Sequence, residues 1–312
     1  MSASGGNKAI IAAFFANLGI ALAKLIGFLI NGASSMLSEA IHSLADTGNQ
    51  ALLLLGRRQA NKDADEAHQF GYGRERFFWA FVVAVVLFTL GSVFAIYEGI
   101  HKIQHPEELT SPAVAIGILL FAMGAEGFSL RTAVKESRDL KGDDSWWGFI
   151  RHSRVPELPV VLLEDFGAMT GLVIAFIAII VSIVTGNGVY DGIGSVAIGL
   201  ILGVIAVILS IEMKSLLIGE PATPHDRDQL RAAIANSPGV IRLIHERTEY
   251  IGAEQVLLAA KVEFDQGLTV AGLADAINTL EANVRAAVPA IELVYIEPDL
   301  YREPGTPTPA QG

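Results

Sequence analysis

Long hydrophobic stretches separated by short polar segments occupy the first 217 residues of the chain. Six of these stretches approach the length that a membrane-spanning helix needs, about 20 largely apolar residues. They cover Ala9–Ile30, Ser35–Leu55, Phe77–Ile100, Ala113–Leu130, Pro159–Val184 and Tyr190–Met213. The pattern therefore predicts a domain of six transmembrane helices over residues 1–217.

The pattern changes after Glu220, where a short linker with two prolines leads into segments that carry more charge. Apolar residues recur at helical or strand spacing in five segments. The helical segments are His225–Asn236 and Leu268–Val288, and the strand segments are Val240–Ile251, Val256–Phe264 and Ile291–Ile296. The order α-β-β-α-β is typical of a small ferredoxin-like α+β layer. We expect this cytoplasmic domain over residues 218–302, followed by a disordered tail at 303–312.

The composition supports a membrane protein and excludes several other classes. Apolar residues make up 52% of the 312 residues and charged residues 18%, whereas soluble domains carry about 25% charged residues. The chain has no cysteine, which excludes disulfides and thiolate metal sites. Its formal charge of −11 makes nucleic acid an unsuitable partner, because phosphate binding requires clustered basic residues.

The loops between the predicted spans differ in their content of basic residues. The N-terminal segment and the loops after the second and fourth spans carry Lys8, Arg57, Arg58, Lys62, Arg74, Arg76, Arg131, Lys135, Arg138, Lys141, Arg151 and Arg154. The loops of the opposite side carry only Lys102. Basic residues accumulate on the cytoplasmic side of a membrane. We therefore expect a multi-pass protein of the cytoplasmic membrane with both termini in the cytoplasm.

Ionisable residues lie within two of the predicted spans, where such residues are costly and indicate function. His42 and Asp46 in the second span are four residues apart and share one face of a helix. The fifth span carries the adjacent pair Glu164 and Asp165. Imidazole nitrogen and carboxylate oxygen suit Zn²⁺, and the negative charge offsets that of a dication. These groups predict a divalent-cation site; the alternative is that they only form hydrogen bonds between helices.

The segment Ser34-Ser35-Met36-Leu37-Ser38-Glu39-Ala40-Ile41-His42-Ser43-Leu44-Ala45-Asp46 resembles the second transmembrane helix of the cation diffusion facilitator family. The downstream segment His68-Gln69-Phe70-Gly71-Tyr72-Gly73-Arg74 resembles the loop into that family's third helix. Six spans followed by a small α+β domain match the family over most of the chain. Together with Leu162-Leu163-Glu164-Asp165, these motifs are most similar to the zinc transporter nine-like branch.

The resemblance implies a secondary active transporter rather than an enzyme. Members export a divalent metal, usually Zn²⁺, in exchange for protons, as homodimers in the lipid bilayer. The family's transport site takes two ligands from the second helix, matched here by His42 and Asp46, and two from the fifth, matched here by Asp165. Val161 stands where many members have the fourth ligand, and Glu164 is the expected substitute, with water as the alternative. This oxygen-rich set leaves Mn²⁺, Fe²⁺ or Co²⁺ open as the physiological metal.

The accessory metal sites of the family are reduced in this sequence. Asp65 and His68 match a loop site, but Tyr72 stands where a second histidine often occurs. We expect a structural dimerisation role for the C-terminal domain. These departures keep open a transport-inactive membrane protein that senses metal. A membrane hydrolase is disfavoured, because the chain has neither a His-Glu-x-x-His nor a Gly-x-Ser-x-Gly motif.

Overall fold

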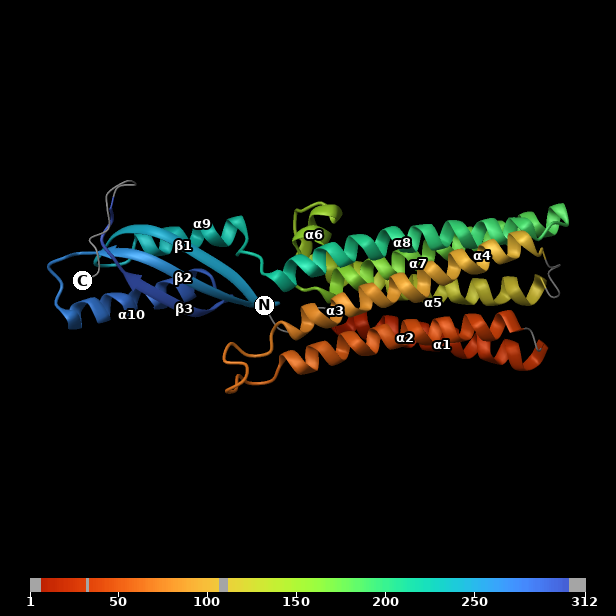
Figure 1. Ribbon diagram of the computed structural model, residues 1–312, viewed down its shortest axis with the longest axis horizontal. Coiled ribbons are helices and arrows are strands. Elements are labelled where there is room, and N and C mark those ends of the chain that lie inside the picture. The colour runs from red at the N-terminus through yellow and green to blue at the C-terminus, as the bar shows by residue number, and fades with distance from the viewer. Residues whose placement is uncertain (1–6, 32–33, 107–111, 303–312) are drawn as a thin grey trace. The chain divides into compact units, whose positions relative to one another are not determined.

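The computed structural model of the chain describes residues 7–31, 34–106 and 112–302. The chain divides into two compact units, Met1–Leu217 and Ile218–Gly312, and Figure 1 shows the elements of each. The tail predicted to be disordered, residues 303–312, lies outside the described residues.

The first unit consists of helices that run alongside one another (Figure 1). They are α1 (Asn7–Asn31), α2 (Ser34–Ala60), α3 (Glu75–Val86), the π-helix η1 (Leu87–Val93), α4 (Phe94–Gln104), α5 (Pro112–Lys141), the short α6 (Trp146–His152), α7 (Glu157–Thr185) and α8 (Val189–Ile218). The elements α3, η1 and α4 follow one another without a break and form one predicted span. Within the described residues, α1, the α3–η1–α4 segment, α5, α7 and α8 are each long and apolar enough to cross a membrane.

Helix α2 is the predicted second span, and its composition sets it apart from the others. Its 27 residues give a length of about 40 Å at 1.5 Å per residue, enough to cross a bilayer. It is more polar than the other long helices, yet Ser43, Thr47, Asn49 and Gln50 are all buried. The helix packs against α1 and α3. These four polar residues therefore face protein, as the bilayer requires of polar groups within a spanning helix.

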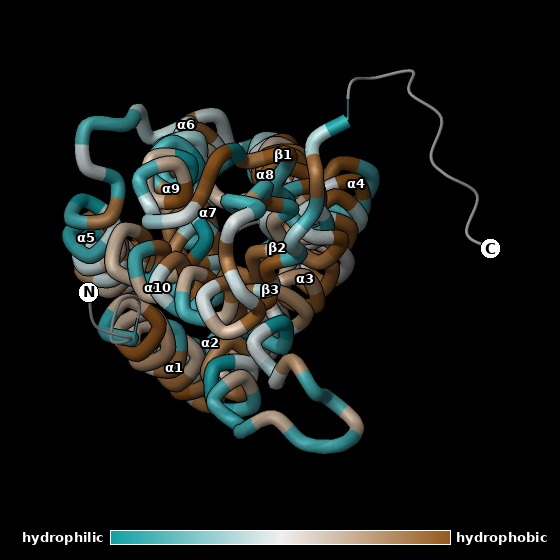
Figure 2. The backbone as a smooth tube through the Cα atoms, turned by 90° about the vertical axis from the view of Figure 1, so that its left-hand side faces the viewer, coloured by the Kyte–Doolittle hydropathy of each residue, from teal (hydrophilic) through white to brown (hydrophobic). Residues whose placement is uncertain are grey.

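The outer surface of the helical unit is apolar. Large side chains such as Phe15, Phe128, Leu200 and Val204 are more than half exposed, and brown, the colour of hydrophobic residues, recurs along the tubes of α1, α3 and α4 in Figure 2. An extended apolar surface of this kind marks contact with a membrane or a partner protein. The chain is thus a multi-pass membrane protein.

The second unit has the predicted element order. It contains α9 (Pro224–Ala235), β1 (Val240–Gly252), β2 (Gln255–Phe264), α10 (Val270–Ala287) and β3 (Ile291–Pro298). The sheet order is β1-β2-β3, with β1 and β2 antiparallel and β2 and β3 parallel. Alternate residues of β2 are buried, as expected for a sheet with one covered face. The predicted fold class, membrane helices followed by a ferredoxin-like α+β domain, is confirmed.

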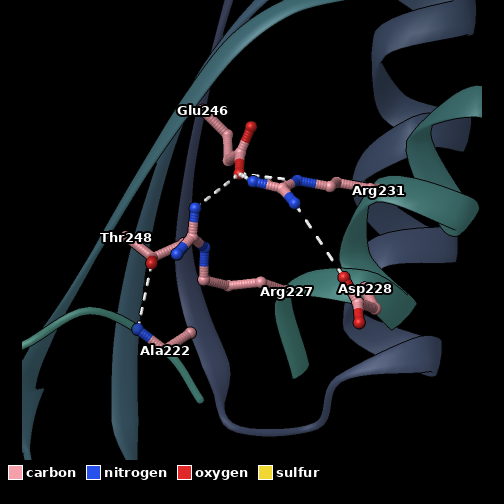
Figure 3. Close-up of polar contacts among 6 residues, drawn as sticks. All are labelled: Ala222, Arg227, Asp228, Arg231, Glu246 and Thr248. Carbon is pink, nitrogen blue, oxygen red and sulfur yellow. Dashed lines mark hydrogen bonds and ion pairs between the residues drawn. The ribbon is translucent and has the colours of Figure 1, made fainter. Parts of the chain in front are cut away.

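A polar network joins α9 to β1 (Figure 3). The carboxylate of Glu246 on β1 accepts hydrogen bonds from Arg231 Nε at 2.8 Å and from Arg227 Nη2 at 3.3 Å. Burial alone raises the pKa of Glu246, but the hydrogen bonds from Arg231 and Arg227 outweigh burial and leave that pKa below its ordinary value. Nearby, the backbone N–H of Ala222 donates to Thr248 Oγ1 at 3.0 Å. The network fixes the first helix of the domain on the edge strand.

Candidate metal-transport site

Four acidic residues from three helices lie close together within the helical unit. Asp46 belongs to α2, Glu126 to α5, and Glu164 and Asp165 to α7. Glu126, Glu164 and Asp165 are buried, and Asp46 is partly buried. Glu126 interacts electrostatically with Asp46 and Asp165, and Glu164 interacts with the same two residues. The folding of the helices thus collects carboxyl groups where apolar surroundings make their ionised form costly.

The two adjacent carboxylates of α7 face different neighbouring helices. Asp165 Oδ2 accepts a hydrogen bond of 2.6 Å from Ser129 Oγ on α5. Glu164 Oε2 accepts a hydrogen bond of 2.6 Å from Gln50 Nε2 on α2, and Glu164 Oε1 accepts one of 3.4 Å from Asn49 Nδ2. Successive residues of a helix are rotated by about 100°, which explains why neighbours in sequence bind different helices.

Lys24 of α1 brings a positive charge to this group of carboxylates. Its Nζ donates a hydrogen bond of 3.1 Å to Ser43 Oγ on α2, and it interacts electrostatically with Glu126. With all five groups ionised, Lys24 and the four carboxylates have a net charge of −3. A bound dication reduces the magnitude of that charge, so the arrangement is suited to a divalent cation.

The structure describes only part of the predicted ligand set. His42 belongs to α2, one turn before Asp46, but its side chain lies outside the described residues. Val161, one turn before Asp165, is fully buried and offers no ligand atom. Among the described side chains, no three His, Cys, Asp or Glu residues are close enough to hold a metal ion. The complete site at His42, Asp46, Glu164 and Asp165 stays a prediction.

Glu126 is a member of the cluster that the two predicted ligand pairs did not include. Its sequence signal was weak, a single acidic residue within the apolar segment Ala113–Leu130. No regular spacing links Glu126 to Asp46 or Asp165, and only the packing of α5 against α1 and α7 brings it to them.

Asp65 stabilises the loop between α2 and α3 through hydrogen bonds within that loop. Asp65 Oδ1 accepts hydrogen bonds from the backbone N–H of Ala67 at 2.9 Å and of His68 at 2.7 Å, and Oδ2 accepts one from the Tyr72 hydroxyl at 2.6 Å. The hydrogen bond from Tyr72 is the main reason that the pKa of Asp65 is lowered. His68 Nδ1 lies 3.7 Å from Asp65 Oδ1. The loop geometry thus accounts for Asp65 without a metal ion, and a loop site at Asp65 and His68 stays a prediction.

Comparison with known proteins identifies relatives of the whole chain. A family model described as the cation efflux transmembrane domain matches residues 10–218. The chain is 35% identical over 269 residues to the mitochondrial proton-coupled zinc antiporter SLC30A9 of Xenopus laevis, covering 85% of this chain and 48% of that protein. It is 34% identical over 246 residues to the human SLC30A9 protein, covering 78% of this chain and 43% of that protein.

A plant protein is similar in sequence to the chain to a comparable extent. The chain is 30% identical over 270 residues to metal tolerance protein C4 of Arabidopsis thaliana, covering 84% of this chain and 58% of that protein. The chain therefore spans about half the length of the curated relatives it matches.

Proposed function

The chain belongs to the cation efflux family, close to the zinc transporter nine-like branch, and from this premise we propose that it exports a divalent cation, first of all Zn²⁺, in exchange for protons. The observation that carries the proposal is the cluster of the buried Glu126, Glu164 and Asp165 and the partly buried Asp46, beside Lys24. Such a cluster inside a membrane unit attracts a dication far better than it serves as packing.

The proposed ligands of the transported ion are His42 and Asp46 from α2 and Asp165 and Glu164 from α7. His42, Asp46 and Asp165 supply one nitrogen and two carboxylates, and Glu164 completes a four-coordinate shell. Glu164 must turn from its amide partners toward the ion to do so. The same set accepts Mn²⁺, Fe²⁺ or Co²⁺, because carboxylate-rich sites bind harder metals well.

Proton exchange follows from the chemistry of these ligands. A metal ion binds deprotonated carboxylate and neutral imidazole, so its binding releases protons and its departure allows them to return. Suppose that the transporter changes between its inward-open and outward-open states only when the site holds either metal or protons. An inward proton gradient then drives outward metal flux. The relatives named as proton-coupled zinc antiporters support this coupling.

Orientation and assembly complete the proposal. The basic loops put the N- and C-termini of the chain on the cytoplasmic side of the cytoplasmic membrane. We propose a homodimer as the working unit, with the α+β domain as a dimerisation element.

The test is metal flux in proteoliposomes with an imposed pH gradient, run in parallel on Zn²⁺, Mn²⁺, Fe²⁺ and Co²⁺. We expect flux that follows the proton gradient and is abolished by Asp165→Asn. Glu98→Gln, which changes an acidic residue of α4 not placed in the cluster, is the matched control and keeps the wild-type rate. Flux that ignores the pH gradient contradicts antiport, and absence of flux for all four metals contradicts the transport function itself.

A further inference from the structure

Two buried amide side chains next to Glu164 have oxygens without a hydrogen-bond partner among the described residues. Asn49 is 2% exposed and Gln50 is fully buried, and both donate through nitrogen to the Glu164 carboxylate. Among the described residues, Asn49 Oδ1 and Gln50 Oε1 have no hydrogen-bond partner. A buried amide oxygen without a partner costs about 1–3 kcal/mol. Two such oxygens, on amides that bind the same carboxylate, therefore indicate that something binds them.

The geometry allows both oxygens and the carboxylate to share one ion. The oxygen and nitrogen of an amide are joined through one carbon, so Gln50 Oε1 lies within about 5 Å of Glu164 Oε2. Two oxygens bound to a single divalent ion are up to about 4–5 Å apart, twice the metal–oxygen distance. The amide nitrogens face Glu164 in this structure. When the amide groups of Asn49 and Gln50 turn over, so that oxygen replaces nitrogen on the side of Glu164, three oxygens can surround one cation.

We propose that Asn49, Gln50 and Glu164 form a second, oxygen-only cation position, separate from the position at His42, Asp46 and Asp165. The inference rests on the proposed transport function. Asn49 and Gln50 follow Asp46 by three and four residues, which places them about 5–6 Å further along α2. They lie on the side of Arg57 and Arg58, the predicted cytoplasmic end, so an exported ion meets this position first.

The chemistry of the three oxygens suits a waiting position. Carboxylate and amide oxygens bind hard divalent cations and hold Zn²⁺ less tightly than a site with imidazole does. An ion on a transport path must bind well enough to enter and weakly enough to leave. Glu164 also interacts electrostatically with Asp46 and Asp165. It can therefore accompany the ion from the amide oxygens to the histidine-containing position, serving as a ligand in both.

The test exploits the absence of cysteine from the chain. Asn49→Cys places a sulfur near the position of the amide carbon, and sulfur prefers Cd²⁺ over Mn²⁺. The experiment compares Cd²⁺ and Mn²⁺ binding to the purified full-length protein in detergent, for the wild type and the variant. If Asn49 is a ligand, Asn49→Cys raises the ratio of Cd²⁺ to Mn²⁺ affinity by at least about 10-fold. Loss of affinity for both metals by the same factor assigns Asn49 only to positioning Glu164 and overturns the proposal.

Ser182→Cys is the matched control. Ser182 Oγ is also buried and unpartnered among the described residues, but it lies on α7 roughly 27 Å along the helix from Glu164 at 1.5 Å per residue. We expect this thiol to leave the Cd²⁺ to Mn²⁺ ratio unchanged. An equal increase in both variants shows that any buried thiol captures Cd²⁺, which also overturns the proposal.

A second measurement separates this inference from the proposed function. The triple variant His42→Ala, Asp46→Asn, Asp165→Asn removes the other position, and we expect it to retain one weak ion that is lost on adding Gln50→Leu. A folded triple variant that binds no ion, beside a wild type that binds and transports, overturns the second position alone. Retention of the weak ion by the triple variant, beside a wild type that shows no flux, refutes transport but not the cation position.

Discussion

Arg76 on α3 and Glu157 on α7 form two parallel hydrogen bonds, Nε to Oε1 at 2.6 Å and Nη2 to Oε2 at 2.8 Å. Glu157 is 1% exposed. The pair joins the first turns of α3 and α7, and its two residues are 81 positions apart in sequence. Since α7 carries Glu164 and Asp165, the ion pair helps to set the position of the proposed ligands in the bundle.

We predict that Glu157→Ala destabilises the helical unit by about 3–5 kcal/mol, because it leaves the Arg76 guanidinium largely buried without its partner. Thermal unfolding in detergent, followed by size-exclusion chromatography, measures the loss. The control is Glu212→Ala, which removes a partner of the more exposed Arg151 at 3.4 Å; we expect a change of at most about 1 kcal/mol. Equal effects of the two substitutions contradict the role assigned to Glu157.

Close packing of α4 against α8 depends on Gly99. A Cβ atom at Gly99 would lie 2.7 Å from the carbonyl oxygen of Gly192 and 2.7 Å from the backbone nitrogen of Val196. Backbone atoms cannot rotate away, so Gly99→Ala must separate the helices. We predict destabilisation by about 1–3 kcal/mol and reduced transport, measured by thermal unfolding and metal flux.

Gly117→Ala is the matched control for that substitution. Nothing lies within 4 Å of a Cβ atom at Gly117 on α5. Alanine favours a helix over glycine by about 1 kcal/mol, so we expect unchanged or slightly increased stability. A loss of stability at Gly117 equal to that at Gly99 would show that helical glycines matter here for a reason other than close packing.

Val161→His is predicted to shift metal preference toward Zn²⁺. Val161 precedes Asp165 by one turn on the same face of α7, so the substitution recreates a His-x-x-x-Asp pair opposite His42 and Asp46. Imidazole favours Zn²⁺ over Mn²⁺. Competition between the two metals in proteoliposomes measures the preference. Val160 is equally buried but about 100° around the helix, so Val160→His should lower activity without changing the preference.

Glu126→Gln is predicted to weaken metal binding without abolishing transport. The substitution removes a carboxyl group that can ionise beside Asp46 and Asp165 when a cation binds, while keeping the shape of the side chain. We expect the metal KM to rise by roughly 10-fold, corresponding to about 1.4 kcal/mol, with a smaller change in maximal rate. An unchanged KM would show that Glu126 has no electrostatic influence on the ion.

The link between α9 and β1 is predicted to weaken in acid. The folded-state pKa of Glu246 lies below its ordinary value of 4.5. Glu246 therefore contributes stability at neutral pH, and this contribution is lost as the pH falls below about 4.5. Because Arg227 and Arg231 are partly exposed, we expect their contacts with Glu246 to contribute about 1 kcal/mol to the stability of the domain. Hydrogen-exchange protection of α9 measures it: Glu246→Gln should reduce protection at pH 7, and the difference from wild type should disappear at acidic pH.

Hydrophobic periodicity was sufficient to predict the long helices of the first unit and the elements of the second, but not the short α6 or the π-helix η1. The predicted strand at Val240–Ile251 corresponds to β1 at Val240–Gly252, and the predicted helix at Leu268–Val288 to α10 at Val270–Ala287. Apolar runs and alternation reflect burial along a single element, so the sequence contains them directly. The family resemblance likewise depended on short contiguous motifs around His42 and Asp46.

Only the tertiary structure decided which polar groups meet across helices. Glu164 and Asp165 are adjacent in sequence, yet Glu164 binds Gln50 on α2 and Asp165 binds Ser129 on α5. Glu126 joins them although its local sequence gives only a weak signal, a single acidic residue in an apolar segment. Such contacts depend on the rotation and depth of each helix, which are set by the packing of all its neighbours together. A pattern within one segment therefore records which face is polar, but not the residues of other helices that face it.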